Sequence, residues 1–262
     1  MTAPAGQWGD LSQRLLSGAI AAIIGLVAMW QGGLAFQILV AVISGIMVWE
    51  LARMTGAGSL SVPFGILSGV ILYFLVSLPA GIALPLLFLP ALLGIGMLKD
   101  NRVVFAIYAL LILIAGFGLV SLRIDFGFLW MAWLALVVIA SDVMGYFAGR
   151  FIGGPKFWPK VSPKKTWSGT IAGWIGAAIV GAVLMYMGAA SAEIIGISIA
   201  LAIAGQFGDV AESALKRQMG VKDSSNILPG HGGMFDRFDA MLGASLFLLL
   251  IGQIINFPPL PV

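Results

Sequence analysis

Acidic and basic side chains gather in one stretch of an otherwise apolar chain, residues 213–239. The stretch holds four basic residues, three Asp and His231, the only histidine of the chain. Basic side chains neutralise phosphate oxygens, and Asp carboxylates are hard oxygen ligands that suit Mg²⁺. Gly and Pro at positions 229–233 let the backbone turn tightly and approach a ligand. These residue types indicate phosphate and metal chemistry; the alternative is a solvated loop with ordinary positive charge.

Two further acids, Asp142 and Asp209, lie inside apolar runs. A charge within a membrane span costs about 2.5–3.5 kcal/mol on insertion scales and usually serves a function. On a helix, four polar residues share one face at i, i+3, i+7 and i+10: Gln206, Asp209, Ser213 and Lys216. This stripe either meets a polar partner from elsewhere or satisfies itself through an internal Asp209–Lys216 pair.

The composition indicates an integral membrane protein. The mean hydropathy is +1.06 over 262 residues, with 60% hydrophobic and 10% charged residues. Several apolar runs reach the roughly 20 residues that cross a bilayer core of about 30 Å. Cysteine is absent, which excludes disulfides and thiolate chemistry. The pI of about 9.3 does not indicate a nucleic-acid partner, because the basic residues lie in short loops beside apolar runs.

The hydropathy pattern predicts an all-α polytopic integral membrane protein with about nine transmembrane helices. The expected spans are residues 15–30, 34–51, 62–78, 80–98, 103–122, 128–149, 169–187, 194–215 and 240–256. The first lacks a convincing cleavage site, so we interpret it as an uncleaved span rather than a signal peptide. We divide the chain into an N-terminal transmembrane region, 1–125, and a C-terminal catalytic region, 126–262, which includes loops 150–168 and 216–238.

The positive charges predict the orientation. With a cytoplasmic N-terminus and an outer C-terminus, all but one of the 14 Lys and Arg residues, Arg123, fall inside. The same arrangement brings Asp142, Asp209 and Asp236 to the cytoplasmic side, where we expect the site. In the seventh span, small residues at every fourth position permit close packing, within one protomer or across a homodimer: Gly169, Gly173, Ala177 and Gly181.

The stretch 213–239 resembles the signature of the phosphatidate cytidylyltransferases, also called CDP-diacylglycerol synthases. The matching positions are Ser213, Lys216, Arg217, Lys222, Asp223, Ser225, Leu228, Pro229, His231, Gly232, Gly233, Asp236, Arg237 and Asp239. A match of this length is very specific. The resemblance covers most of the chain but is sharp only in its second half.

A second segment is similar to the nucleotide-side motif of the same family. Its matching residues are Asp142, Gly145, Tyr146, Gly149, Arg150, Gly153, Lys156 and the run 162–167. Ser168 stands where many members have Glu, and Gly145 replaces a usual Ala. Pro163 halts a helix, so we expect Lys164 and Lys165 to project from a turn towards a triphosphate or, alternatively, towards lipid head groups.

The resemblance implies an Mg²⁺-dependent nucleotidyltransferase that makes CDP-diacylglycerol from CTP and phosphatidic acid for phospholipid biosynthesis, in the cell inner (plasma) membrane. Its partners would be these substrates and membrane lipids, with a homodimer as a further expectation. The implied metal ligands are Asp209 and Asp236, with room for a second cation. The implied catalytic residues are Asp209, Asp236, Lys216, Arg217 and Asp239. The implied substrate-binding residues are Ser213, Lys222, Asp223, His231, Gly232, Gly233, Arg237, Lys164, Lys165, Asp142, Tyr146 and Arg150.

Two other functions fit parts of the pattern. A CTP-dependent kinase for a polyprenol or similar lipid alcohol would use the same phosphate site but needs a base for the hydroxyl. An ion-coupled transporter would use the intramembrane acids, but it predicts charges near the midplane rather than at one face.

Overall fold

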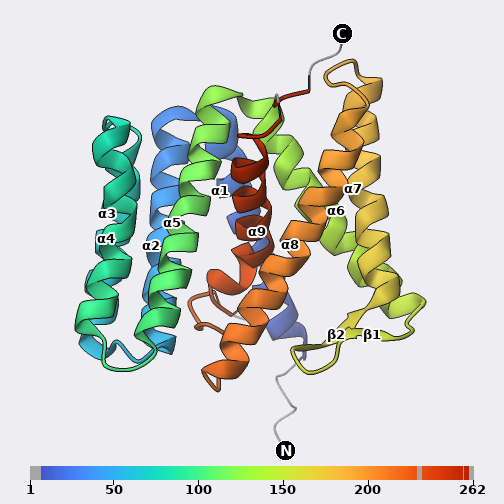
Figure 1. Ribbon diagram of the computed structural model, residues 1–262. Helices are drawn as coiled ribbons and strands as arrows, with labels where there is room; N and C mark the ends of the chain where they lie inside the picture. Colours follow the sequence, from blue (N-terminus) through green and yellow to red (C-terminus); the bar gives the residue numbers. More distant parts are fainter. Residues whose placement is uncertain (1–6, 229–231, 256, 260–262) are drawn as a thin grey trace, which may run out of the picture.

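The computed structural model describes residues 7–228, 232–255 and 257–259. Nine α-helices and a short strand pair make up the described part of the chain, and the helices run alternately up and down (Figure 1). Their bounds are α1 (Gln7–Gln31), α2 (Gly33–Met54), α3 (Ser61–Leu75), α4 (Ala80–Met97), α5 (Arg102–Asp125), α6 (Phe128–Phe151), β1 (Lys156–Trp158), β2 (Ser162–Thr166), α7 (Trp167–Tyr186), α8 (Glu193–Gln218) and α9 (Phe235–Ile251), with a 3₁₀ turn, η1 (Gly58–Leu60), before α3.

The helices confirm the predicted membrane character. Six helical segments of the described chain are long and apolar enough to cross a bilayer: α2, η1 with α3, α5, α6, α7 and α8. Two shorter apolar helices cover residues 18–31 and 81–97. The chain is therefore a multi-pass membrane protein, whereas nine crossings and the orientation of the termini stay predictions.

The predicted start of the ninth span is wrong by five residues, because α9 begins at Phe235 rather than at 240. The first amides of a helix have no partner within the helix. Here the Glu50 carboxylate of α2 accepts from the amides of Met234 and Phe235, at 2.9 and 2.7 Å. Because this cap lies upstream of Asp236, both Asp236 and Asp239 stand on the helix instead of in the preceding loop.

The segment between α6 and α7 is a β-hairpin, so the fold is mostly rather than purely helical. β1 and β2 pair antiparallel, with Lys156 opposite Thr166. The predicted turn at Lys164 and Lys165 is wrong, since both belong to β2. Pro163 ends a helical pattern, but it is tolerated in a two-stranded edge. Along β2, Lys164 is exposed and Lys165 is half-buried, and both line one cavity.

The core follows α5, α6 and α9, and the largest fully buried side chains include Phe105, Trp133 and Phe235. α9 lies between α5 and α8 (Figure 1). Side-chain hydrogen bonds join neighbouring helices within this core. Ser245 Oγ donates to the carbonyl of Ala115 at 2.8 Å, and Trp133 Nε1 donates to Ser198 Oγ at 3.0 Å.

Glycines bring α8 and α9 into backbone contact. A Cβ added at Gly208 would overlap with the carbonyl oxygen of Asp239, and one at Gly205 would lie 3.1 Å from the carbonyl oxygen of Ala240. Gly243 of α9 faces Gly208 in the same way. Close contact of small residues is the usual means of helix association in a membrane. It fixes how the acids of the two helices are spaced.

The small-residue stripe of α7 packs inside the protomer. A Cβ at Gly169 would meet the carbonyl oxygen of Gly145, and one at Gly173 would meet Ser141, both on α6. Gly181 instead approaches Ile195 of α8. The first of the two predicted roles is therefore confirmed. A homodimer stays a prediction. This stripe does not support it, because its glycines face α6 and α8 of the same protomer.

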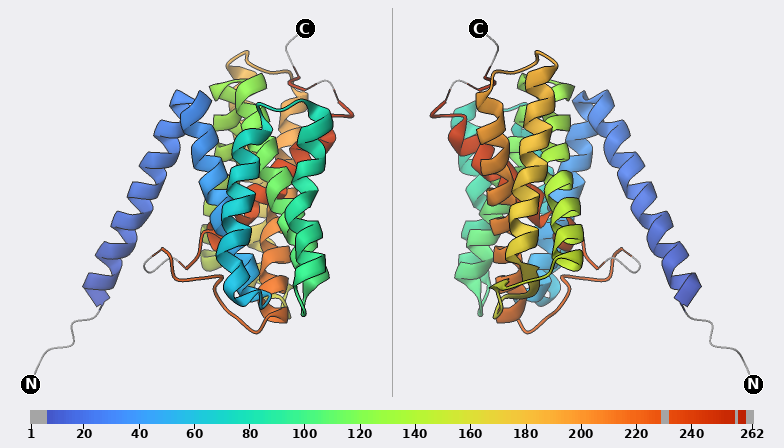
Figure 2. Two further views of the ribbon diagram at one scale, coloured as in Figure 1. Left: turned by 90° about the vertical axis from the view of Figure 1, so that its left-hand side faces the viewer. Right: turned by 90° about the vertical axis from the view of Figure 1, so that its right-hand side faces the viewer.

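The first helix leaves the bundle. α1 contacts α2 at one end and then diverges from the other helices (Figure 2). Arg123, in the last turn of α5, holds the near end of α1: its Nε donates to the carbonyl of Met29 at 2.8 Å, and its Nη2 donates to that of Trp30 at 3.1 Å. These contacts lie at the end of the bundle opposite the hairpin (Figure 1).

Candidate functional site

The α8–α9 interface carries charges at two levels near the hairpin end. At the outer level, Lys216 Nζ lies 2.6 Å from both Asp236 Oδ1 and Glu212 Oε2. The other oxygen of Asp236, Oδ2, accepts from the Ser224 amide at 2.9 Å, the Ser224 hydroxyl at 2.8 Å and the Gly233 amide at 2.8 Å. Asp236 therefore ties both ends of the loop 224–233 to the end of α8.

At the inner level, Asp209 meets a cation from another element. Its Oδ2 lies 2.6 Å from Lys165 Nζ of β2, and Ser213 Oγ donates to its Oδ1 at 3.4 Å. Asp142 of α6 lines the same cavity as Asp209, and the main chain of Asp239 on α9 contacts Gly208, the residue before Asp209. The internal Asp209–Lys216 pair is absent from the described contacts, because each residue has a different ionic partner. The polar stripe of α8 thus meets partners from elsewhere.

A cavity of about 510 Å³ opens beside this inner level. Six predicted site residues line it: Asp142, Tyr146, Arg150, Lys164, Lys165 and Asp209. The Arg150 guanidinium donates to Tyr146 Oη at 2.7 Å. Three cations and two carboxylates from α6, β2 and α8 thus line one cavity. This combination suits an anionic ligand with a bound cation.

Hydroxyls and amides fix the inner end of this cavity. Thr166 caps α7, since its Oγ1 accepts from the amide of Gly169 at 3.2 Å. Gln206 accepts from Trp174 Nε1 at 3.0 Å and donates to the carbonyl of Thr170 at 3.3 Å. Ser168, in the place of the usual Glu, donates to the carbonyl of Gly153 and bonds Thr166 at 3.0 Å. Ser168 therefore has a structural role in holding the hairpin to α7.

The remaining predicted residues differ in where they lie: four charged residues are on the surface, two glycines form the turn before α9, and one residue is outside the described chain. Arg217, Lys222, Asp223 and Arg237 are exposed. Gly232 adopts φ +83°, a conformation that side chains disfavour, so the turn there requires glycine. A Cβ at Gly233 would overlap with Ser224 and Glu50. His231, with Pro229 and Gly230, lies outside the described residues.

Glu50 of α2 is a site residue that the sequence analysis missed. Its side chain is fully buried, and it accepts from Ser225 Oγ as well as from the first amides of α9. The positive end of the helix dipole favours a carboxylate at this position. The available signal was an acid at the end of the apolar run 34–51.

Glu212 is the second omission. It is 1% exposed and pairs with Lys216 one helical turn later. The Glu–Lys spacing of four residues was visible in the sequence, and this order of acid before base is the favourable one on a helix.

The donor set fits a divalent cation. Three carboxylates lie beside the ammonium groups at this end: Asp209 beside Lys165, and Glu212 and Asp236 beside Lys216. Asp142 lines the same cavity as Asp209. Carboxylate oxygens are hard ligands that suit Mg²⁺, which usually takes one or two of them from the protein. Within the described ranges, no three acids or histidines converge closely enough to enclose an ion by themselves. Water and ligand oxygens would complete the shell, as is usual for this metal.

Fold and site together define a class: a multi-pass membrane protein that handles anionic, phosphate-bearing ligands at one end of its helix bundle. The comparison with known families makes this specific. Residues 12–255 match the model of the cytidylyltransferase family, and the chain belongs to that family.

Curated relatives cover nearly the whole chain. A phosphatidate cytidylyltransferase of Brucella suis is 35% identical over 262 residues, which is 96% of this chain and 97% of the relative. The proteins of that name from Bacillus subtilis and Staphylococcus aureus (strain COL) are 33% and 32% identical, over 92% and 87% of this chain and 97% and 94% of their own lengths. The resemblance found in the signature therefore extends along the full sequence.

Proposed function

We propose that this protein transfers the cytidylyl group of CTP to phosphatidic acid, giving CDP-diacylglycerol and pyrophosphate. Membership of the cytidylyltransferase family and three relatives named phosphatidate cytidylyltransferase support this activity. The observation that carries it is the cavity in which Lys165 and Asp209 form an ion pair beside Arg150 and Lys164. Such a site can hold a triphosphate and a cation together.

The nucleotide's phosphates would lie against the cations of this cavity. Lys164 is exposed and Lys165 is held 2.6 Å from Asp209, so a triphosphate would draw Lys165 away from its carboxylate. Arg150, fixed by its bond to Tyr146, offers a planar fork for phosphate oxygens. Arg217 and Lys222 extend the positive surface towards the lipid head group.

The reaction needs positioning more than proton transfer. A lipid phosphate is largely ionised at neutral pH, so one of its oxygens attacks the α-phosphorus directly. The new phosphorus–oxygen bond forms as the bond between the α-phosphorus and the bridging oxygen breaks, and pyrophosphate leaves with that electron pair. Lys165, Lys216 and Arg150 would stabilise the charge that develops on the phosphate oxygens. His231 is then not required as a base, and we expect it to bind phosphate or order its loop.

We propose Mg²⁺ as the cofactor, held by Asp209 and Asp236, with Asp142 or Asp239 able to hold a second cation. When bound, the ion would neutralise phosphate charge and align the two substrates. The protein would hold Asp209 and Asp236 at neighbouring levels of the contact between α8 and α9. The carboxylates of Asp142 and Asp209, which line one cavity, support this assignment.

The membrane arrangement completes the proposal. Nine crossings, with the N-terminus in the cytoplasm and the C-terminus outside, would put the site at the cytoplasmic face of the inner membrane. The basic loops at the hairpin end support this orientation. Acyl chains would stay in lipid while the head group enters the polar site.

The test is purified protein in detergent with CTP labelled in the cytosine ring, phosphatidic acid and Mg²⁺. We expect a labelled liponucleotide and one pyrophosphate for each CTP consumed. Release of CDP with a polyprenol as acceptor would instead identify a lipid kinase. Ion flux in sealed liposomes without CTP would favour the transporter.

A further inference from the structure

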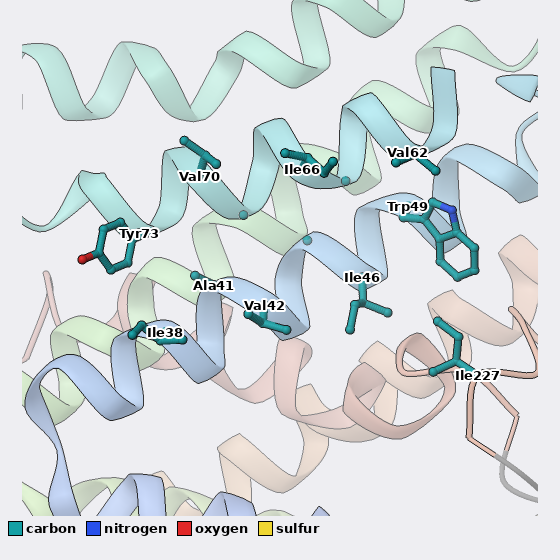
Figure 3. Close-up of a pocket in the computed structure, with 13 residues that line it drawn as sticks. Ile38, Ala41, Val42, Ile46, Trp49, Val62, Ile66, Val70, Tyr73 and Ile227 are labelled. Carbon is teal, nitrogen blue, oxygen red and sulfur yellow. The ribbon is translucent and has the colours of Figure 1, made fainter. Parts of the chain in front are cut away.

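An apolar groove of about 510 Å³ runs along the outer face of α2 and α3, away from the polar cavity. Its floor is made of glycines: a Cβ at Gly45 would lie 2.8 Å from the carbonyl oxygen of Gly65, and one at Gly69 would lie 3.1 Å from that of Ala41. The backbones therefore touch, and side chains on either side form the walls. Figure 3 shows these walls along the two helices: Ile38, Val42 and Ile46 on α2, and Val62, Ile66 and Val70 on α3.

One end of the groove reaches the loop that Asp236 holds. Ile227 of this loop lines the groove next to Trp49 (Figure 3). The residue after Trp49 is Glu50, which accepts from Ser225 of the same loop. The groove thus begins where the candidate site ends.

A cation stands at this end. The guanidinium of Arg53 lies 4.9 Å from the centre of the Trp49 ring, and its side chain is exposed. An arginine stacked on an indole at the end of an apolar channel is complementary to an anionic head group on a hydrocarbon chain. Trp and Arg are also typical anchors at the membrane–water boundary.

The length of the groove fits one leaflet. From Ile38 to Trp49, α2 rises about 17 Å at 1.5 Å per residue, close to the roughly 15 Å that is half of a bilayer's hydrocarbon core. An ordinary lipid-facing surface presents ridges of side chains, whereas here the glycine floor leaves a continuous depression.

We propose that this groove binds one acyl chain of the phosphatidic acid substrate, with the lipid phosphate directed to Arg53 and to residues 222–228 of the adjoining loop. This inference rests on the proposed function. It assigns the lipid side of the reaction to α2 and α3 of the N-terminal region, and the nucleotide side to α6, β2 and α8.

Filling the groove tests the proposal. Ile66→Trp puts a large side chain into a wall position that is 63% exposed, and Leu92→Trp makes the same change on α4, at a residue that is 61% exposed and does not line the groove. For Ile66→Trp, we expect the KM for long-chain phosphatidic acid to rise at least about tenfold, since two or three displaced methylenes account for that factor. The kcat and the KM for CTP should stay at wild-type values, and Leu92→Trp should resemble wild type throughout.

Acyl-chain length and head-group charge separate the two parts of the site. Dihexanoyl phosphatidic acid, which barely enters the groove, should have the same KM with wild type and Ile66→Trp. Arg53→Met should raise the KM for both chain lengths by the same factor. An unchanged KM for long chains with Ile66→Trp would overturn the proposal while leaving the proposed function intact.

Photolabelling decides the question even without turnover. Phosphatidic acid with a diazirine at the end of one chain should label peptides of α2 and α3 in wild type and lose this label in Ile66→Trp. Equal labelling by a phosphatidylcholine probe would show ordinary boundary lipid and overturn the inference. If wild type forms no liponucleotide, the proposed function fails, and this labelling result still stands for or against the groove.

Discussion

The Glu50 carboxylate offers the sharpest test of how the site is assembled. It accepts three hydrogen bonds, from Ser225 Oγ and from the amides of Met234 and Phe235, and it is fully buried. Glu50→Ala removes both acceptor oxygens, breaks all three hydrogen bonds and leaves the amides of Met234 and Phe235 unpaired. The loop 224–233 and the first turn of α9 would then lose the contact that fixes them to α2.

The size of the effect follows from these contacts. A hydrogen bond to a charged group contributes about 1.5–3 kcal/mol, and a buried unpaired amide adds a penalty of about 1–3 kcal/mol. The helix start can relax towards water, so we expect a loss of about 3–5 kcal/mol in local stability, the range seen when a buried pair is broken. A displacement of Asp236 by about 1 Å would lower kcat by about 10²-fold. Glu50→Gln retains one acceptor oxygen, and its kcat should fall by about tenfold.

The assay is liponucleotide formation by purified variants, together with the thermal unfolding temperature in the same detergent. Ser225→Ala, which removes one of the three donors, should fall between wild type and Glu50→Ala. Glu193→Gln changes an exposed acid at the start of α8 and serves as the matched control. Wild-type kcat in a folded Glu50→Ala protein would refute the idea that this carboxylate positions the loop.

Three further predictions follow from the same geometry. Asp209→Asn should lower kcat by about 10²–10³-fold, the scale of losing a principal electrostatic contact; near-normal CTP turnover at saturating Mg²⁺ would contradict its assignment as a metal ligand. Gly208→Ala should lower the unfolding temperature because its Cβ overlaps with Asp239, whereas Gly196→Ala on the same helix meets nothing within 4 Å and should gain up to about 1 kcal/mol in helix propensity. Chelation by EDTA should abolish liponucleotide formation, and Mg²⁺ should restore it; full activity of the chelated enzyme would exclude a divalent cofactor.

Periodicity and hydropathy predicted most of the fold. Apolar runs bounded by polar turns placed most helix ends within a few residues, because a bilayer demands long, continuous apolar helices. Hydropathy did not predict where the ninth helix begins. Its first turn carries Asp236 and Arg237, and its first amides are capped by Glu50, 185 residues before Phe235. Hydropathy carries no information about such a distant contact.

The site was predicted in part, for a related reason. The stripe predicted that Asp209 and Lys216 share a face of α8, because short spacings on one helix fix a common face. The signature added Asp236, which lies on α9 and pairs with Lys216. They did not reveal which charges pair. Lys165 reaches Asp209 from β2 of a hairpin, whereas Pro163 had indicated a turn there.

The glycine contact between α8 and α9 has a consequence for how this enzyme can vary. Because Gly208 and Gly243 leave no side chain between the helices, main-chain contact sets how far apart the Cα atoms of Asp209 and Asp239 lie. Substitutions elsewhere in the bundle can then accumulate without changing this separation. A change in the separation would require a new contact between α8 and α9, since exchanging the carboxylates alone leaves the glycine contact unchanged.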